Sequence, residues 1–558
     1  MNFFDKKVLE IVKDCKDYYF EGEYIELKQP EIPGYIFSRL YTTPSKYFTA
    51  YMMKDKVLKL MDADFEYTKA EVTDFHCRFE YDSSIKYDGF WLIISESMIR
   101  IRASADRGFL YAYNYANALL IENGGRYYLP VIEVMHEPSV RVRGMLEGFY
   151  GTPWTHEERL DEVDFLSEAK LNAFMYAPKD DIYHRKKWAV LYPEKEMGRL
   201  KEIIDKCREQ YIDFYYAISP GNSIKYKDKN DLDKLMEKLE QVIRVGVTKF
   251  ALLLDDIDYE LEPSTRITFS RSGIAQAYLA NQVCESLGER LAEYEFMVCP
   301  TEYMQTFDTQ YKEDLEKFLN PDIAIMWTGS SIMPRRIHSE DMRFISNRYK
   351  RKIAIWDNVP CNDYENKEVL SFTPYMNRSK LIESFPVDSV FANGMIQYEA
   401  SKITMLTVAD YLWNAGNYNP VEAFHKSIAT LEPVKQEALE FFCSHHQNCG
   451  VYNTIPLHIR EAIEYNEVQV ITREMEQLYH AAQELDGMEN LKLKGTIQPW
   501  IDRAKKDYNA WKKILSNDWR REEFEELRAD KVSSSCSIPL RYYKKYILQD
   551  KDWQDNDI

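Results

Sequence analysis

The sequence predicts an α/β protein built on a TIM (β/α)8 barrel, with an α+β domain before the barrel and a helical bundle after it. Three observations support this prediction. Between residues 141 and 415, short apolar runs alternate with longer amphipathic stretches, which is the pattern of repeated βα units. The residues before this region mix strand and helix patterns, and those after about 420 carry apolar positions at helical spacing.

Apolar runs in the middle region predict about eight parallel strands, the number that closes such a barrel. The runs cover residues 142–149, 171–177, 212–218, 249–254, 296–299, 324–327, 353–356 and 389–392. Helical patterns lie between them and are clearest at residues 157–168, 196–208, 232–244 and 274–291. Each is long enough for the crossover that parallel strands require, so we expect right-handed βα units.

The flanking regions have different patterns and predict separate domains. Residues 1–138 contain expected strands at 48–53 and 89–94 and an expected helix near 107–121. Residues 416–558 contain charged amphipathic stretches, such as 471–485 and 511–527, which predict a helical bundle. The predicted domains are therefore residues 1–138, 139–415 and 416–558.

Composition excludes several classes of partner. The chain has 558 residues and a formal net charge of -19, which would repel nucleic acid and anionic membrane surfaces. Its nine cysteines are scattered, as expected for reduced thiols rather than a disulfide scaffold. The first residues lack a signal-peptide pattern, so we expect a cytoplasmic protein, or a secreted one if a signal has been removed. A monomer and a homo-oligomer both stay open.

Polar residues follow the predicted strands, at the end of the barrel where active sites form. They lie at 147–151, 179–181, 255–256, 301–303, 357–358 and 393. Neighbouring side chains in a strand point to opposite faces, so Asp255 and Asp256 can share one pocket only where their strand ends. Two adjacent carboxyls resist simultaneous ionisation, so one can serve as an acid while the other stays an anion.

The acidic pair and a group of cysteine and histidine residues each allow a different interpretation. The Asp255–Asp256 pair, with Asp258, is also compatible with a solvated loop or a site for a hard cation. Residues 443–449 contain cysteine and histidine, but their spacing matches no common zinc pattern. The recurrence of polar residues at several strand ends favours a catalytic pocket, and no metal site is predicted.

Several ordered motifs resemble glycoside hydrolase family 84, the O-GlcNAcase family. They are RGMLEGFYGTPW at 143–154, YAPKDD at 176–181, FALLLDDID at 250–258, CPTEY at 299–303, WTG at 327–329, IWDN at 355–358 and NDY at 362–364. The segment ADRG at 105–108 and the residues up to 138 also resemble the small domain that precedes such barrels. This resemblance implies a retaining exo-β-N-acetylglucosaminidase that needs no cofactor. The 2-acetamido group of its substrate acts as the nucleophile and forms an oxazoline.

The resemblance also implies a role for each site residue. Asp255 matches the carboxylate that orients the acetamido N–H, and Asp256 matches the acid that protonates the leaving oxygen and later activates water. Tyr303 matches the donor to the acetamido oxygen, and Cys299 matches a residue near the acetamido methyl group. Asn358 matches a residue beside the acid, and Trp356 matches a residue that lines the pocket. The residues that match those holding the sugar hydroxyls are Gly148, Lys179, Asp363 and Asn393.

Competing functions remain open at the level of sequence. A hyaluronidase-like endo-enzyme would use the same chemistry in an open cleft, and a non-catalytic N-acetylglucosamine-binding protein would use only the pocket. Retention of both Asp255 and Asp256 favours an enzyme. The sequence does not distinguish N-acetylglucosamine-bearing proteins from glycans as substrates.

Overall fold

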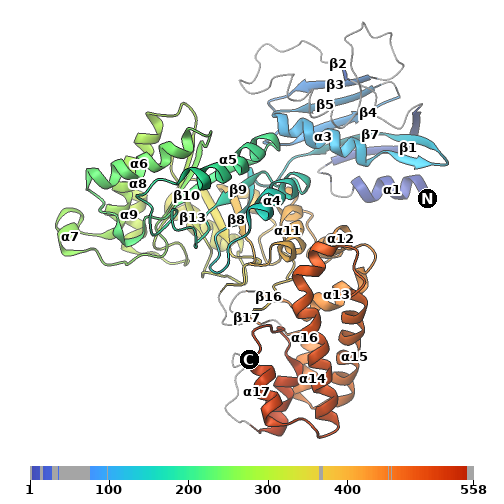
Figure 1. Cartoon of the computed structure of the whole chain (residues 1–558). Coiled ribbons are helices and arrows are strands. Elements are labelled where there is room, and N and C mark those ends of the chain that lie inside the picture. Colours follow the sequence, from blue (N-terminus) through green and yellow to red (C-terminus); the bar gives the residue numbers. More distant parts are fainter. Residues whose placement is uncertain are drawn as a thin grey trace. The chain divides into compact units, whose positions relative to one another are not determined.

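The computed structural model describes residues 3–12, 15, 17–27, 35–36, 76–96, 98–363, 368–449, 452–453 and 455–549 (Figure 1). The chain divides into two compact units. One contains Met1–Arg141 and Leu412–Asn417, and the other contains Val142–Tyr411 and Tyr418–Ile558. The barrel and the C-terminal helices share the second unit, so the expected domain boundaries near 138 and 415 stay predictions.

The first unit is an α+β structure with one mixed sheet, as predicted. Its strands are β1 (Asp17–Leu27), β2 (Tyr35–Ile36), β3 (His76–Tyr81), β4 (Phe90–Ile94), β5 (Met98–Ala103), β6 (Ile121–Asn123) and β7 (Arg126–His136). Their order is β1-β7-β4-β5-β3-β2, with β6 paired to β7. The helices α1 (Phe3–Val12) and α3 (Asp106–Ala118) supply buried side chains to the core of this unit. The expected strand at 89–94 and helix near 107–121 are confirmed, whereas residues 48–53 lie outside the described residues.

The second unit contains the predicted barrel, which is closed and has eight parallel strands. The strands are β8 (Val142–Glu147), β9 (Ala173–Tyr176), β10 (Asp213–Ile218), β11 (Lys249–Leu253), β12 (Glu295–Cys299), β13 (Ala324–Trp327), β14 (Ile353–Asp357) and β15 (Val387–Asn393). Side chains such as Met175, Tyr215 and Phe391 fill the interior. A Cβ atom at Gly144 would lie 2.6 Å from the Phe391 ring, so glycine is required there.

Helices surround the barrel in the order that the sequence predicts. They are α4 (His156–Glu168), α5 (Glu194–Glu209), α6 (Lys229–Ile243), α7 (Pro263–Phe269), α8 (Ser272–Gly288), α9 (Gln310–Phe318), α10 (Ser339–Tyr349) and α11 (Tyr398–Trp413). At the start of α4, the Thr155 hydroxyl accepts from the Glu158 N–H, and the Glu158 carboxylate accepts from the Thr155 N–H. This reciprocal pair satisfies two N–H groups that would otherwise lack partners at a helix end.

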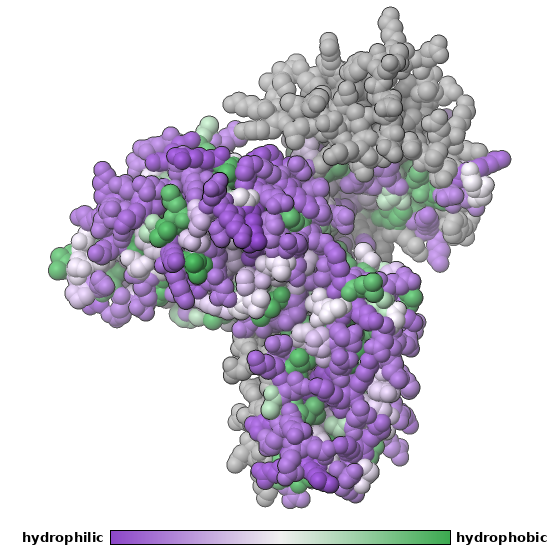
Figure 2. Space-filling view, in the orientation of Figure 1, coloured by the Kyte–Doolittle hydropathy of each residue, from purple (hydrophilic) through white to green (hydrophobic). Residues whose placement is uncertain are grey.

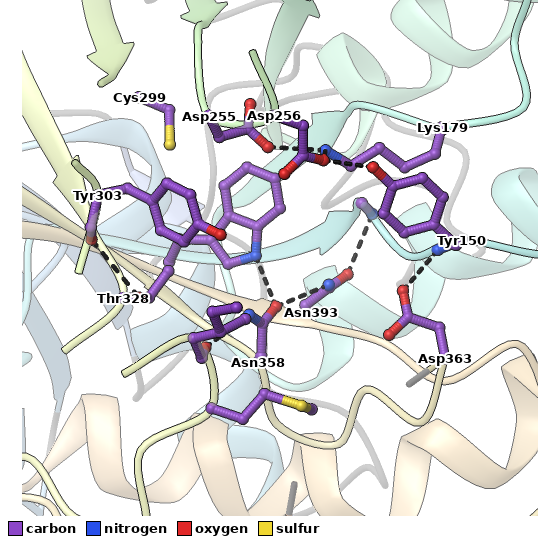
Figure 3. A pocket seen from close by; sticks show the side chains of 14 residues that line it. Tyr150, Lys179, Asp255, Asp256, Cys299, Tyr303, Thr328, Asn358, Asp363 and Asn393 are labelled. Carbon is purple, nitrogen blue, oxygen red and sulfur yellow. Dashed lines mark hydrogen bonds and ion pairs between the residues drawn. The ribbon is translucent and has the colours of Figure 1, made fainter. Parts of the chain in front are cut away.

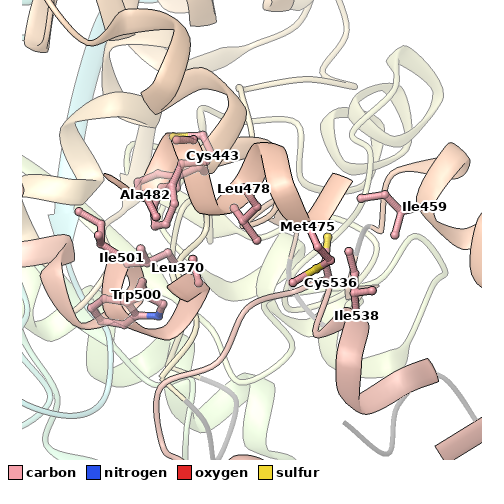
Figure 4. Close-up of a cluster of buried hydrophobic side chains, with 14 of the residues drawn as sticks. Leu370, Cys443, Ile459, Met475, Leu478, Ala482, Trp500, Ile501, Cys536 and Ile538 are labelled. Carbon is pink, nitrogen blue, oxygen red and sulfur yellow. The ribbon is translucent and has the colours of Figure 1, made fainter. Parts of the chain in front are cut away.

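The C-terminal region is helical, which confirms the predicted bundle. It comprises α12 (Pro420–Leu431), α13 (Gln436–Ser444), α14 (Leu457–Glu464), α15 (Val468–Leu485), α16 (Leu491–Leu515), α17 (Arg521–Ala529) and α18 (Ile538–Tyr542). Leu478, Ala482 and Ile501 belong to its buried core (Figure 4). The visible face of these helices is mainly hydrophilic (Figure 2), as expected for amphipathic helices that bury their apolar positions. None of the helices in the described part of the chain has the length and apolar character needed to cross a bilayer.

The connection between β14 and β15 also packs into the core of the C-terminal helices. Leu370 and Phe372 are buried members of that core. The Glu368 carbonyl accepts from the indole N–H of Trp500 at 2.9 Å and from the Ser533 N–H at 3.1 Å. The β14–β15 connection therefore links the barrel to the C-terminal helices.

Two carboxylates at the barrel strand ends are fully buried in ion pairs. Glu147, at the end of β8, accepts two bonds of 2.7 Å from Arg159 on α4. Asp357, at the end of β14, accepts from Arg378 at 2.6 and 2.8 Å and from the Tyr375 hydroxyl at 2.7 Å. Both carboxylates have hydrogen-bond partners within the protein. Glu147 therefore holds α4 against the barrel, and Asp357 holds the β14–β15 connection.

Neutralising Asp357 should destabilise the second unit strongly. Asp357→Asn leaves the Arg378 charge buried without a counter-charge, and such a change reduces the free energy of unfolding by about 3–5 kcal/mol. The matched control is Asp308→Asn, because the Asp308 side chain is 60% exposed and its 3.2 Å ion pair with Arg348 should contribute no more than about 1 kcal/mol. Urea-induced unfolding of both variants measures the difference. Equal losses would contradict the structural role of Asp357.

Candidate active site

A pocket of about 250 Å³ lies at the C-terminal ends of the barrel strands (Figure 3). Every site residue expected from the sequence lines it, so the structure brings all of them together, although their individual roles stay predictions. The lining residues are Gly148, Tyr150, Lys179, Asp255, Asp256, Cys299, Tyr303, Thr328, Ile332, Met333, Trp356, Asn358, Asp363 and Asn393.

Asp255 and Asp256 enter this pocket together because they follow β11, where the strand ends. Leu254 makes the last bond to the neighbouring strand, from its N–H to the Cys299 carbonyl at 2.8 Å. The Lys179 ammonium then lies 2.9 Å from Asp255 Oδ2 and 3.5 Å from Asp256 Oδ2. The Asp255 side chain is 8% exposed and that of Asp256 is 35% exposed, so the two carboxylates have different environments.

Asp255 is held as an anion with one oxygen left without a partner. Burial raises the pKa of its carboxyl. The charge and hydrogen bond of Lys179, its own backbone N–H and the charge of Arg185 together lower the pKa by more, so the net shift is downward. Asp255 is therefore the member of the pair that is suited to stay ionised. Its Oδ1 is buried and accepts no hydrogen bond from the described residues. Because a buried carboxylate oxygen without a donor is costly, this atom is suited to accept an N–H from a ligand.

Lys179 is a buried cation surrounded by opposite charge and aromatic rings. Burial lowers the pKa of its ammonium group, but the negative charges of Asp255 and Asp256 outweigh burial and raise it. Its Nζ lies 5.3 Å from the centroid of the Trp356 ring and 5.4 Å from that of Tyr150. Lys179 thus stays protonated and fixes the positions of the two carboxylates.

Asn358 connects three other parts of the pocket. Its Oδ1 accepts from the Trp356 indole at 2.8 Å and from the Asn393 amide at 2.9 Å, and its own amide donates to the Ile332 carbonyl at 2.8 Å. Asn393 in turn accepts from the Gly148 N–H at 3.0 Å. The Gly148 N–H is therefore already used, and only its carbonyl remains for a ligand.

Gly148 also lacks space for a side chain. A Cβ atom at this position would lie 2.8 Å from the Trp356 ring. The close approach of backbone and indole therefore explains the glycine at the first position after β8.

Tyr303 and Cys299 form a neutral part of the wall. Burial and the charges of Asp256 and Asp255 raise the pKa of the Tyr303 phenol, so it remains a hydrogen-bond donor. Burial and the charge of Asp255 also raise the pKa of the Cys299 thiol. A neutral thiol is a poor nucleophile, so Cys299 is suited to apolar contact.

Four lining residues were not expected as site residues. Tyr150 belongs to the 143–154 motif, and Thr328 belongs to the 327–329 motif, so both could have been found there. Ile332 and Met333 lie in the loop after β13, and an apolar loop residue carries no signal of a binding role. Asp363 is among the described residues, whereas its neighbour Tyr364 in the NDY motif is not.

Other strand-end acids hold loops instead of lining the pocket. Asp181 accepts from the hydroxyls of Tyr176 at 2.9 Å and Tyr192 at 2.8 Å. Glu302 lies 3.3 Å from the buried Lys312 ammonium and accepts from the Thr309 hydroxyl. Together with Glu147 and Asp357, they show that a polar residue at a strand end can also be structural.

The interpretation of the acidic pair as a cation site gains no support from the described residues. No group of three or more histidine, cysteine or acidic side chains in that part of the chain is arranged to hold a metal ion. Asp258 is paired with Asn222 through contacts of 2.8 and 3.1 Å.

Comparison with known proteins gives a consistent family relationship. A family model described as beta-N-acetylglucosaminidase matches residues 143–444. Two curated relatives, the proteins named Protein O-GlcNAcase from Rattus norvegicus and Mus musculus, are each 36% identical over 285 residues, which is 50% of this chain. The match spans only 30% of the length of each relative.

Solved structures resemble the chain over most of its length. The structure titled CpGH84B has a TM-score of 0.78 at 26% identity. The match covers 95% of this chain and 98% of the CpGH84B chain. A variant of an O-GlcNAc hydrolase from Thermobaculum terrenum has a TM-score of 0.67 at 26% identity and covers 73% of this chain and 94% of its own.

Proposed function

The chain belongs to the beta-N-acetylglucosaminidase family, glycoside hydrolase family 84, and from this premise we propose that it is a retaining exo-β-N-acetylglucosaminidase. The observation that carries the proposal is the state of Asp255. One of its oxygens is bound by Lys179, and the other is buried, unpartnered and suited to an acetamido N–H. A two-carboxylate enzyme without substrate assistance has no need for such an acceptor.

The proposed first step uses the acetamido group of the substrate as the nucleophile. Its carbonyl oxygen forms a bond to the anomeric carbon while the bond from that carbon to the leaving oxygen breaks. The leaving oxygen takes a proton from Asp256. The product is an oxazoline that still carries the acetamido proton on its nitrogen, a cation paired with the Asp255 anion. Positive charge grows on the acetamido nitrogen during this step, so its hydrogen bond to the Asp255 anion strengthens in the transition state. Tyr303, which stays a phenol, is suited to donate to the acetamido oxygen.

The second step opens the oxazoline with water. Asp256, now a carboxylate, accepts a proton from a water molecule as the water oxygen bonds to the anomeric carbon. The bond from that carbon to the acetamido oxygen breaks at the same time, which restores the neutral acetamido group. Two inversions at the same carbon give net retention. The Asp256 carboxyl carries both proton transfers in this scheme, so the scheme requires no metal.

We further propose that the aglycone is a protein carrying N-acetylglucosamine on serine or threonine. Support comes from the curated relatives, which are named Protein O-GlcNAcase, and from the similar O-GlcNAc hydrolase structure. Glycans with a terminal N-acetylglucosamine are the second candidate, because the pocket residues proposed to bind the sugar would not select its aglycone.

Hydrolysis of p-nitrophenyl β-N-acetylglucosaminide tests the proposed function. We expect turnover with β-N-acetylglucosamine as the first product, detected by NMR, and inhibition by an N-acetylglucosamine-derived thiazoline that mimics the oxazoline. EDTA should leave the rate unchanged. Parallel assays with N-acetylglucosaminyl peptides, chito-oligosaccharides and hyaluronan identify the preferred aglycone. Faster cleavage of internal bonds in hyaluronan would favour the endo-acting alternative, and thiazoline binding without turnover would favour a non-catalytic binding protein.

The two carboxylates should respond differently to substitution. Asp256→Asn should lower kcat/KM for substrates with poor leaving groups by about 10²–10⁴-fold, because it removes the proton donor, while thiazoline affinity changes little. Asp255→Ala should lower both the rate and thiazoline affinity, the latter by about tenfold or more, because it removes a charged hydrogen-bond acceptor. Inhibition constants and kinetics of both variants provide the measurement. Unchanged thiazoline affinity in Asp255→Ala would refute the orienting role.

Replacement of Lys179 should change the acid side of the pH profile. In the proposed mechanism Asp255 must be ionised, and Lys179 makes the largest contribution that lowers its pKa against the effect of burial. Lys179→Met removes the largest effects that oppose burial and leaves only the backbone hydrogen bond of Asp255 and the charge of Arg185. The pKa of Asp255 therefore rises, and the acid limb of the kcat/KM profile moves to higher pH by about one unit or more. Lys179→Arg keeps the charge and should keep the limb near its original position. An acid limb that stays unmoved in Lys179→Met would contradict this explanation.

A further inference from the structure

Tyr150 contacts Asp256 from the loop after β8, and backbone hydrogen bonds hold that loop to Asp363 and to Asn393. Its hydroxyl donates to Asp256 Oδ2 (Figure 3), and its backbone N–H donates to Asp363 Oδ2 at 2.6 Å. Two residues earlier, the Gly148 N–H donates to Asn393 at 3.0 Å. The phenol is therefore held against Asp256 by the backbone of the loop that follows β8.

The orientation of the Asp256 carboxyl depends on the hydrogen bond from Tyr150, because Asp256 is more exposed than Asp255 and has few other contacts. Its side chain is 35% exposed, and its other polar contact among the described residues is Lys179 at 3.5 Å, also to Oδ2. Rotation about the terminal bond of a carboxyl side chain is loosely restrained unless its oxygens are bound. Tyr150 thus acts together with the more distant Lys179 to direct Oδ2 of Asp256 toward the protein, which leaves Oδ1 for the opening of the pocket.

Arg185 fixes the direction of this hydrogen bond. Its guanidinium Nη1 lies 3.2 Å from the Tyr150 hydroxyl oxygen. A guanidinium group can only donate, so the Tyr150 oxygen accepts from Arg185 and its own hydrogen is left to donate to Asp256 Oδ2. The Lys179 ammonium, which also can only donate, approaches the same Oδ2. Oδ2 is therefore the accepting oxygen, and a proton carried by this carboxyl lies on Oδ1.

We propose that Arg185 and Tyr150 form a positioning pair that presents Oδ1 of Asp256 for proton transfer to the leaving oxygen. This inference rests on the proposed function. Arg185 acts through Tyr150, and Tyr150 acts through Asp256. In the first step the proton leaves Oδ1 for the glycosidic oxygen and the carboxyl becomes an anion. The bond from Tyr150 then becomes charge-assisted and stronger, so the pair stabilises the transition state more than the ground state.

The dependence on leaving group separates a positioning role from a general structural one. A dinitrophenyl leaving group departs without a proton, whereas the alcohol of a glycosylated peptide requires one. Tyr150→Phe should therefore reduce kcat/KM for an N-acetylglucosaminyl peptide at least about tenfold more than for the dinitrophenyl glycoside, the scale of a hydrogen bond to a charged group. Equal losses on both substrates would overturn the proposal.

The link from Arg185 to Tyr150 is tested by a double-mutant cycle. Arg185→Met should show the same leaving-group bias with a smaller loss, Arg185→Lys should restore part of it, and Arg185→Met combined with Tyr150→Phe should be no worse than Tyr150→Phe alone. Additive losses would show that Arg185 does not act through Tyr150. Lys186→Met is the matched control, because Lys186 is the exposed neighbour of Arg185, and its kinetics should equal those of the wild type.

Two further measurements make the outcomes distinguishable. Thiazoline affinity should be retained in Tyr150→Phe and Arg185→Met, and its loss would mean that these residues maintain the whole pocket, which overturns the positioning role. If the wild type hydrolyses neither glycoside, the proposed function fails and the positioning pair fails with it. If the wild type hydrolyses both and the variants show no leaving-group bias, only the positioning pair is rejected.

Discussion

The ion pair between the buried ammonium of Lys179 and Asp255 is the interaction on which the pocket depends. Each group would be expensive to bury alone, and together they keep a cation and an anion in a site from which water is largely excluded. Lys179 uses Oδ2 of Asp255, which leaves Oδ1 as a buried acceptor without a donor. The same ammonium approaches Asp256 less closely, so the two neighbouring carboxylates have unequal surroundings and can take unequal roles.

This arrangement requires rigid support, and the barrel provides it with other ion pairs. Glu147 and Asp357 lie at strand ends and are buried against Arg159 and Arg378, which lie on the following helix and loop. These pairs hold the connections from which pocket residues project. The Asn358 side chain serves a similar purpose inside the pocket, because it bonds at once to Trp356, Asn393 and the loop after β13. Preformed contacts of this kind let a site stabilise charge without reorganising.

Much of the architecture was predictable because parallel barrel strands are buried on both faces and appear in sequence as apolar runs. The meeting of the expected site residues in one pocket was also predictable, since the carboxyl ends of the strands of one barrel converge. The sequence did not predict which acidic residues at the strand ends line the pocket and which are buried in ion pairs that support the fold. Asp255 and Asp357 look alike in sequence, and they differ because Arg378 and Tyr375 surround Asp357 in the fold. Tyr150 was missed because a tyrosine after a strand is as typical of packing as of proton chemistry.

The C-terminal helices contribute to the site through the connection between β14 and β15. The Asn362 amide donates to the Val369 carbonyl at 2.6 Å, within that connection, and to the Gln397 side chain at 2.8 Å, which lies between β15 and α11. Glu368, the neighbour of Val369, accepts from Trp500 and from Ser533. Asp363 in turn holds the backbone of Tyr150. A chain of hydrogen bonds thus runs from the helical core to Tyr150 and Asp256 in the pocket.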